Sequence, residues 1–335
     1  MAASAAPGPG RRAALVCRWL FVPVAAPVAL VSTFRALPVE WPVLPVQLVA
    51  FTPWLAPPAA AALLLAFAGR SRWQQAVAAG LLGCQAFWLY PLDVRVPAAE
   101  AAGTPVTLVA MTINAELGRA DAGDVVGLVR DRHVDLLVVE EFTPDMSRRL
   151  TAAGLDVLLP HRISDARDGA GGSAIYSSRV LTESGVVPGT RFSMPVARVD
   201  LGDGSGAALQ VVAVHALAPA GDAVDQWRSD LAAVGRADNG SGPVLLAGDF
   251  NATYDHREFR MLLAGTGGRR ALVDVAASQG SRLVPTWPMR DYRLPRITLD
   301  HLVTSPDIRG SSYSVHPIDG SDHAAVLATL QIHVP

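Results

Sequence analysis

Polar side chains that could do chemistry directly follow short apolar runs in the second part of this 335-residue chain. The apolar run at residues 244–247 ends at Gly248 and is followed by Asp249 and Asn251. Such a run has the length, and the flanking residues, of a strand buried on both faces. Because side chains two residues apart on a strand point the same way, Asp249 and Asn251 would face one spot at the rim of a sheet. The alternative is that both are turn or capping residues, which local hydrogen bonds to the backbone favour.

Similar residues stand at the ends of five other predicted strands. They are Asn114, Glu140 with Glu141, His215, Asp300, and Asp322 with His323. One such strand end means little, because turn chemistry is common there, whereas six indicate a shared site. Carboxylates and an amide oxygen are ligands suited to Mg²⁺ or Mn²⁺, and the lack of clustered cysteines argues against structural zinc. Since Mg²⁺ binds through a few carboxylates and substrate phosphates, the sequence predicts metal-assisted phosphoryl chemistry.

The elements that would position these residues mix strands and helices without a strict alternation. Strands are predicted at residues 106–113, 136–140, 157–159, 173–177, 196–201, 209–214, 244–247, 297–303, 313–316 and 324–332, and helices at 124–132, 144–153, 223–236 and 256–263. Several strand pairs are joined by links of hairpin length. The pattern therefore predicts an α/β fold of two packed sheets with helices outside them.

The first hundred residues have a different composition. Three apolar stretches, residues 13–34, 43–68 and 73–92, are each close to the roughly 20 residues that a membrane-spanning helix needs. We predict a membrane anchor of about three transmembrane helices over residues 1–96, a linker at 97–105 and a catalytic domain at 106–335. Two alternatives stay open: the first stretch is a cleavable signal peptide, or the proline-rich second stretch is interfacial or re-entrant.

The distribution of arginine predicts the orientation of the chain. Arg11, Arg12 and Arg18 lie at the start of the first stretch, and Arg70 and Arg72 lie between the second and the third. The positive-inside rule places these residues in the cytoplasm. An odd number of spans then sends the catalytic domain outside a cell membrane that the chain crosses several times. No disulfide is expected in that domain, since both cysteines fall in the apolar section.

The motifs resemble the endonuclease/exonuclease/phosphatase superfamily in order and spacing, from residue 104 to the end. The residues that carry the resemblance are Asn114, the DLLVVEE segment ending at Glu141, His215, the GDFN segment from Gly248, Asp300 and the SDH segment from Ser321. The resemblance implies a four-layer α/β/β/α sandwich with one divalent-metal site at the sheet edges. It also implies that Glu141 is the main ligand of Mg²⁺ or Mn²⁺, assisted by Asn114 and Asp322. This chain has Glu140 where the family often has Gln, which adds negative charge beside the site unless the side chain faces away.

The same resemblance implies roles for the remaining polar residues. Asp249 and Asn251 would position the attacking water and the phosphate, and His323, oriented by Asp300, would handle protons. His215 would hold a phosphate oxygen or protonate the leaving group. Whether Asp249 or His323 is the general base stays open.

An irregular stretch before the strand of Asp300 could overhang the site. It reads TWPMRDYRLPR and contains Trp287, Arg290 and Arg293. We expect these arginines to contact substrate phosphate and Trp287 to stack on or shield the substrate. Arginines of an ordinary solvated loop are the alternative.

Apolar spans followed by such a domain resemble the membrane-anchored VanJ-like subgroup of actinobacterial proteins, linked to resistance to teicoplanin-type glycopeptides. That resemblance implies a phosphoesterase acting outside the membrane on a phosphorylated small molecule or lipid, such as a polyprenyl pyrophosphate or another cell-wall intermediate. An extracytoplasmic nuclease and a sphingomyelinase-like phosphodiesterase are alternatives, and a non-catalytic membrane binding protein is a third. From residue 104 onward 21 Arg face 27 acidic residues, a balance of −6, and nucleic acid normally requires a basic surface. The sequence does not indicate an oligomeric state.

Overall fold

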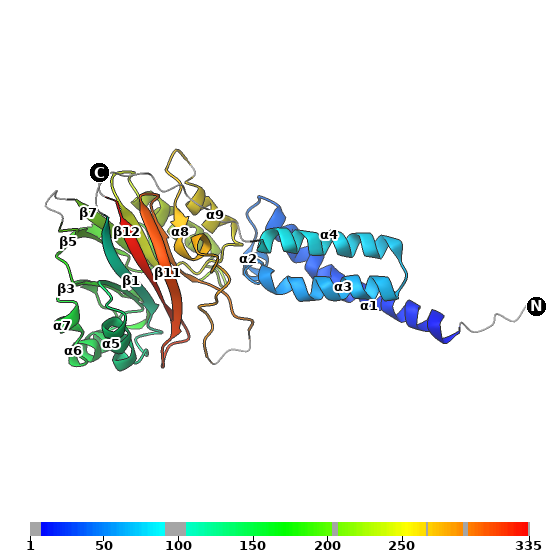
Figure 1. Cartoon of the computed structure of the whole chain (residues 1–335), viewed down its shortest axis with the longest axis horizontal. Helices are drawn as coiled ribbons and strands as arrows, with labels where there is room; N and C mark the ends of the chain where they lie inside the picture. The colour runs from blue at the N-terminus through cyan, green and yellow to red at the C-terminus, as the bar shows by residue number, and fades with distance from the viewer. Residues whose placement is uncertain (1–7, 91–104, 203–206, 266, 291–293, 334–335) are drawn as a thin grey trace, which may run out of the picture. The chain divides into compact units, whose positions relative to one another are not determined.

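The computed structural model describes residues 8–90, 105–202, 207–265, 267–290 and 294–333. The chain divides into two compact units, Met1–Pro91 and Leu92–Pro335, and within the described residues every strand belongs to the second (Figure 1). The predicted linker lies outside the described residues except for Pro105, and Arg293 also lies outside them.

The second unit is built on two six-stranded sheets. The first has the order β11 (Ile308–Pro317), β12 (Ala324–Ile332), β1 (Val106–Asn114), β2 (Leu136–Glu140), β4 (Ser173–Ser177) and β3 (His161–Asp165). The second has the order β5 (Leu181–Val186), β6 (Pro195–Asp200), β7 (Ala208–His215), β8 (Val244–Asp249), β10 (Asp300–Thr304) and β9 (Val273–Asp274). Each is mixed, with one parallel pair at its centre, β1 with β2 and β7 with β8.

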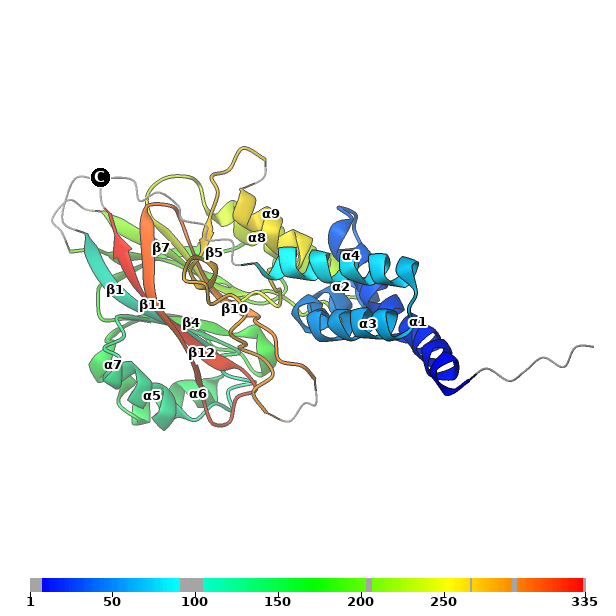
Figure 2. The same cartoon turned by 45° about the vertical axis from the view of Figure 1, so that its right-hand side comes forward.

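Helices cover the outer face of each sheet. Helices α5 (Ala122–Asp131), α6 (Pro144–Ala152) and α7 (Leu155–Leu158) lie on the first sheet, and α8 (Val224–Ala237) and α9 (Arg257–Ala264) lie on the second (Figure 2). The short elements are η2 (Gly169–Gly171) and α10 (Val275–Ser278). The predicted four-layer α/β/β/α sandwich is therefore confirmed.

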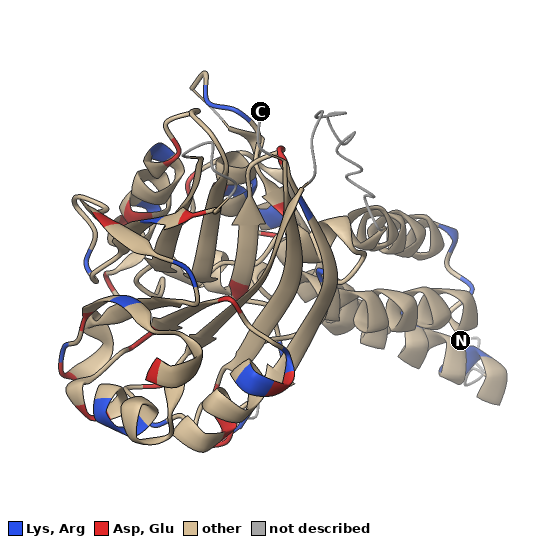
Figure 3. Ribbon diagram, turned by 60° about the vertical axis from the view of Figure 1, so that its left-hand side comes forward, with Lys and Arg blue, Asp and Glu red and all other residues tan. Residues whose placement is uncertain are grey.

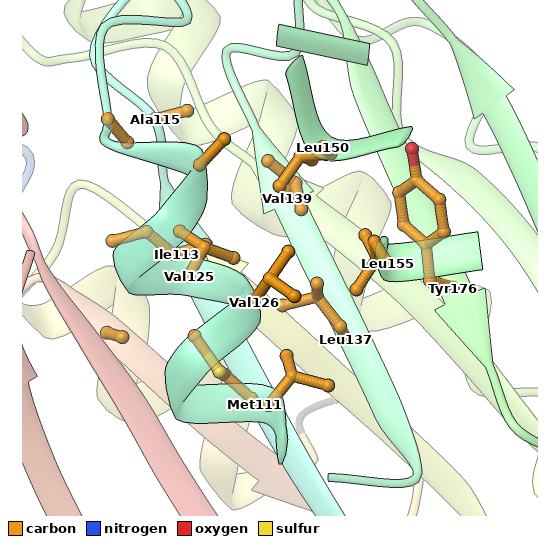
Figure 4. Packing of buried hydrophobic residues seen from close by; sticks show 14 of the residues in the cluster. Met111, Ile113, Ala115, Val125, Val126, Leu137, Val139, Leu150, Leu155 and Tyr176 are labelled. Atoms are coloured by element: carbon orange, nitrogen blue, oxygen red, sulfur yellow. The ribbon is translucent and has the colours of Figure 1, made fainter. Parts of the chain in front are cut away.

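Strand alternation separates two hydrophobic cores. On β1, Leu108 and Ala110 point between the sheets, whereas Met111 and Ile113 point to the helices. The core under α5–α7 is packed with branched and aromatic side chains, among them Tyr176 (Figure 4). Because both faces are covered, the central strands are mostly apolar and do not alternate regularly with polar residues.

Strand direction brings the predicted site residues to one end of the sandwich. The parallel strands β1 and β2 end at the same edge of the first sheet, and the antiparallel β12 begins there. In the second sheet β7 and β8 end at one edge and the antiparallel β10 begins there, with Asp249 paired to both His215 and Asp300. Residues 245, 247 and 249 share one strand face, so Asp249 points between the sheets beyond Leu245 and Ala247.

Some local predictions were wrong. The apolar residues 157–159, predicted as a strand, lie at the end of helix α7, and the strand in this region is β3, after Pro160. The predicted strand from Ile297 begins at Asp300, because Ile297 pairs only with Trp287 through an isolated bridge. Strands β5 and β9 were not predicted: β5 is a mostly exposed edge with a register shift, and β9 has two residues.

Gly248 allows β7 and β8 to approach closely, and replacing it should destabilise the sandwich. Its φ is 143°, and a Cβ there would overlap the carbonyl oxygen of Val214 and lie 2.8 Å from Glu140 Oε1. Since both neighbours belong to the packed interior, we expect Gly248→Ala to lower the free energy of unfolding by about 3 kcal/mol in urea denaturation. Gly240→Ala is the matched control: φ is 77° with nothing near the added atom, so about 1 kcal/mol from backbone strain is expected. Equal losses in the two variants would contradict the packing argument.

The first unit is a set of helices, α1 (Pro9–Ala36), α2 (Val43–Val49), η1 (Thr52–Leu55), α3 (Ala56–Ala68) and α4 (Arg72–Leu89). Small and aromatic side chains such as Ala25, Ala62 and Ala78 pack α1, α3 and α4 together. Arg18, a charge inside the first apolar stretch, donates from Nε to Gly69 O at 2.7 Å and so caps the end of α3. Figure 3 shows few charged residues along these helices.

Only part of the predicted anchor meets the requirements for a membrane span among the described residues. Helix α1 is long and apolar enough to cross a membrane, and lies near the N-terminus, where a signal sequence would share these properties. Residues Val43–Val49 and Thr52–Ala68 qualify only as a pair bent by 72°, as a broken span or a re-entrant loop. Helix α4 is not among the candidates, because it begins with Arg72 and carries several glutamines. The structure thus supports one candidate span and does not support three separate ones.

Candidate active site

Side chains from both sheets meet between the strand ends described above. Asn114, from the end of β1, donates through Nδ2 to Glu141 Oε1 at 3.3 Å and to Asp249 Oδ2 at 3.1 Å. Its amide oxygen accepts from the backbone N–H of Glu116 at 3.0 Å, which fixes the orientation of the amide. Asn114 therefore links a carboxylate of the first sheet to one of the second, across 135 residues of sequence.

Glu141 is held in an unusual backbone conformation directly after β2. Its φ is 52°, and Glu116, Leu117 and Asn251 beside it also have positive φ without being glycine. The carboxylate accepts at Oε2 from the Leu117 N–H at 2.6 Å. Such conformations cost about 1–3 kcal/mol each and cluster at functional sites. In this conformation the carboxylate of Glu141 lies beside Asn114 and His215.

Asp249 is almost fully buried and satisfied by nitrogen donors. Its Oδ1 accepts from the Asn251 N–H at 2.7 Å, and Oδ2 accepts from Asn251 Nδ2 at 3.1 Å as well as from Asn114. Asn251 Nδ2 also donates to Ala216 O at 2.9 Å, which ties the loop after β8 to the loop after β7. Burial raises the pKa of Asp249, the positive His323 opposes this, and the charge of Asp300 adds to it.

Asp300 and His323 form a buried pair. Nδ1 of His323 lies 2.9 Å from Oδ2 and 3.2 Å from Oδ1 of Asp300, while Nε2 is 3.9 Å from Asp249 Oδ2 and 4.0 Å from Asp322 Oδ1. Asp300 thus takes up one ring nitrogen and leaves the other facing the site. Burial alone would lower the pKa of His323, but Asp300 and Asp249 together raise it to about 10.

His215 lies beside Glu141. Its Nε2 is 3.8 Å from Glu141 Oε1, and its ring stacks on Phe192 with centroids 4.5 Å apart. Burial, together with the nearby His323, lowers the pKa of His215 to about 3. The imidazole is therefore neutral at pH 7 and suited to hold an oxygen by a hydrogen bond.

The predicted substrate-binding residues have other contacts in this structure. The indole N–H of Trp287 donates to Asp322 Oδ2 at 3.0 Å. Arg290 bonds through Nη2 to Glu116 Oε2 at 2.5 Å and to Gly320 O at 2.8 Å, across 174 residues of sequence. These contacts place the overhanging segment against the site, and a carboxylate already holds the guanidinium of Arg290.

Glu140 does not face away from the site, because its carboxyl lies between the sheets, where the charges of Asp300 and Asp249 act on it. It is fully buried between the sheets, and its Oε1 accepts from Thr112 Oγ1 at 2.8 Å. Burial, followed by the charge of Asp300, raises the pKa of Glu140 well above its usual value. His301, next to Asp300, points to the other face of β10, where it packs on Phe259 and bonds to Ala252 O.

The donor set fits a divalent cation. Burial raises the pKa of Glu141, the neighbouring Asp322 adds to this, and such crowded carboxylates are stabilised by a cation between them. Asp249, Asp300 and His323 also form a group whose ligand atoms lie within 4.8 Å of one another. His323 uses Nδ1 for its bond to Asp300, so a cation there would have only Nε2 of the ring. The oxygens around Glu141 are the better ligand set, because Mg²⁺ and Mn²⁺ prefer oxygen ligands.

Sequence reasoning gave no role to three residues that organise the site. Ser321 Oγ donates to Asn114 O at 2.7 Å and accepts from His323 N–H at 3.0 Å, which joins β1 to the start of β12. Its position inside the SDH segment was an available signal. Leu117, which donates its backbone N–H to Glu141, and Phe192, which stacks on His215, carry no signal in the sequence.

Comparison with known proteins agrees with this geometry. The endonuclease/exonuclease/phosphatase family matches residues 111–323, which include every site residue described above. The chain belongs to this family. Its members are metal-dependent hydrolases of phosphoester bonds. No curated protein matches the chain.

Solved structures of family members share the fold at low sequence identity. A humanized D. rerio TDP2 is 17% identical, covers 67% of this chain and 99% of its own, and has a TM-score of 0.52. D. rerio TDP2 complexed with single strand DNA product is 16% identical, with 67% and 98% covered and a TM-score of 0.52. An endonuclease/exonuclease/phosphatase from Beutenbergia cavernae DSM 12333 is 17% identical, with 68% and 72% covered and a TM-score of 0.50. These likenesses establish the fold of the second unit.

Proposed function

We propose that this family member is a membrane-anchored hydrolase, dependent on Mg²⁺ or Mn²⁺, that cleaves a phosphate ester or pyrophosphate bond outside the cytoplasmic membrane. The observation that carries the proposal is the meeting of Asn114, Glu141, Asp249 and the Asp300–His323 pair from the ends of separate strands. A non-catalytic binding protein would have no need to keep all of these groups buried and aligned.

The contacts support a division of roles among the residues. Glu141, with Asn114 and Asp322, would hold the cation, which when bound stabilises negative charge on phosphate oxygens. His215 would donate a hydrogen bond to one phosphate oxygen from its neutral ring.

The remaining polar groups would handle the water. Asn251 holds Asp249 in place through two hydrogen bonds, 2.7 Å and 3.1 Å long. Asp249 and the open Nε2 of His323, 3.9 Å apart, are the two groups positioned to exchange a proton with the attacking water and the phosphate. Asp300 would orient the His323 ring.

The first unit supports the membrane part of the proposal. Most of the exposed large hydrophobic side chains of the described residues lie there, including Trp19, Leu64 and Phe87. A soluble surface rarely carries so many, whereas lipid-facing helices do. Because α4 packs with α1 and α3 in one cluster, we propose that it crosses the membrane beside them, which with the arginine distribution puts the second unit outside.

A lipid phosphate fits this location best. An enzyme tethered at the outer face meets polyprenyl pyrophosphates and other cell-wall lipid intermediates, as the VanJ-like resemblance also suggests. The single strand DNA in the TDP2 structure makes nucleic acid the main competing substrate, and the net charge of −6 after residue 103 disfavours it.

Substrate assays with the full chain in detergent test the proposal. We expect phosphate release from a polyprenyl pyrophosphate in Mg²⁺ and none in EDTA, because the carboxylate-rich pocket needs the cation to accept an anion. A phosphodiester lipid and single-stranded and duplex DNA are offered in parallel. Cleavage of DNA alone would favour a nuclease. If none of the substrates is cleaved in a metal-dependent way, the proposal that the protein is an enzyme is refuted. Hydrolysis by intact cells of externally added substrate tests the orientation, since an inward-facing domain would need permeabilised cells.

A further inference from the structure

A short segment before β10 contacts both halves of the site. Residues 286–289 form no helix or strand, yet Thr286 is fully buried. The segment is fixed to the chain ahead of β10, because the N–H groups of Thr286 and Trp287 both donate to Ile297 O at 2.9 Å and Ile297 N–H donates back to Trp287 O at 2.6 Å. This bridged segment is therefore part of the fold around the site.

On one side the segment holds the start of β10. Thr286 Oγ1 accepts from the backbone N–H of Leu299 at 2.9 Å and from that of Asp300 at 3.2 Å. Asp300 is the residue whose carboxylate orients His323. The hydroxyl oxygen of Thr286 thus sets the backbone from which that carboxylate projects.

On the other side the segment holds the start of β12. Met289 N–H donates to Asp322 O at 2.8 Å, and Ala324 N–H donates to Thr286 O at 2.9 Å, so the backbone on both sides of His323 is tied down. The indole N–H of Trp287 donates a hydrogen bond to Asp322 Oδ2 at 3.0 Å. The other oxygen of Asp322, Oδ1, faces His323 Nε2. One carboxylate oxygen is therefore bound and the other directed at the site.

We propose that Thr286 and Trp287 are positioning residues with separate targets, an inference that rests on the proposed function. Trp287 fixes the carboxylate of Asp322 so that Oδ1 is presented to the cation, and Thr286 fixes Asp300 beneath His323. In this role Trp287 acts through its indole N–H, which is used inside the protein. Removing a group that hydrogen-bonds to a metal ligand typically lowers metal affinity or activity about 10- to 100-fold. The test must therefore resolve a change of this size.

Two variants of Trp287 and one of Thr286 separate the roles. We expect Trp287→Phe in the full chain to weaken Mn²⁺ binding, measured by the EPR signal of free Mn²⁺, about 10- to 100-fold, with kcat restored at saturating Mn²⁺. Benzothienylalanine at position 287 keeps the shape of the indole and lacks the N–H, so it should weaken Mn²⁺ binding as much. Thr286→Val should keep Mn²⁺ affinity and lower kcat about tenfold at saturating metal.

Thr298→Val is the matched control. Its hydroxyl bonds only to Arg282 O and Val284 O among the described residues and not to Asp300 or Asp322, so Mn²⁺ affinity and kcat should stay at wild-type values. Wild-type Mn²⁺ affinity in both Trp287 variants would overturn the inference while leaving the proposed function intact. Weak binding in Trp287→Phe alone would mean that the ring packs and does not orient Asp322. A wild-type chain that binds no Mn²⁺ would overturn the proposed function itself.

Discussion

Glu141→Gln is expected to lower kcat by about 10²–10³-fold and to weaken Mn²⁺ binding in the same protein. The change keeps the size of the side chain and removes one negative charge from a group that lies beside both Asn114 and His215. Because a neutral amide attracts a divalent cation far less than a carboxylate, the loss should be larger at low than at saturating metal concentration. Kinetics over a Mg²⁺ series, with Mn²⁺ binding measured separately, provide the test.

Glu140→Gln is the matched control for this prediction, because it makes the same change one residue earlier. Burial raises the pKa of the Glu140 carboxyl well above its usual value, and the group bonds to Thr112 between the sheets, so an amide should replace it with little change in kcat or in metal affinity. Similar losses in both variants would mean that any change at the end of β2 disturbs the sandwich. Full activity of Glu141→Gln would show that Glu141 is not a ligand of the metal.

The site residues could be predicted because each stands where an apolar strand ends. A strand buried on both faces leaves a clear apolar run, and the first polar side chain after it must lie at the edge of the sheet. Asp249 illustrates this: its position follows from the run 244–247 and from strand alternation. What the sequence did not reveal is the positive φ of Glu141, since a tertiary contact, the hydrogen bond from Leu117, stabilises that conformation.

The overhanging segment shows what residue types alone do not give. They predict substrate contacts for Arg290 and Trp287, which stay predictions, but they do not tell which groups lie nearby in space. The structure adds that Arg290 bonds to Glu116, 174 residues away, and that Trp287 donates to Asp322. Segments without periodicity have no pattern that fixes their direction, so their contacts come from the structure alone. In the first unit, hydropathy predicted three apolar stretches, and the prolines of the second gave the alternative of a re-entrant segment, which its bend of 72° fits.

Asp300→Asn should lower kcat about 10³-fold and move the pH profile, and the direction of the movement identifies the role of His323. Asp300 and Asp249 raise the pKa of His323 to about 10, so in the wild type the ring is positively charged at neutral pH and loses its proton only in alkali. Removing the Asp300 charge should lower that pKa by about 1–3 units. If the imidazolium is the active form, with Asp249 as proton acceptor, the alkaline limb of kcat/KM must move to lower pH. A shift confined to the acid limb would show instead that neutral His323 is the base. An unchanged pH profile would show that His323 takes no part in proton transfer. Asp274→Asn, which removes the carboxylate beside His301 on the other face of β10, controls for a change of buried charge, because Asp274 has no contact with His323 among the described residues.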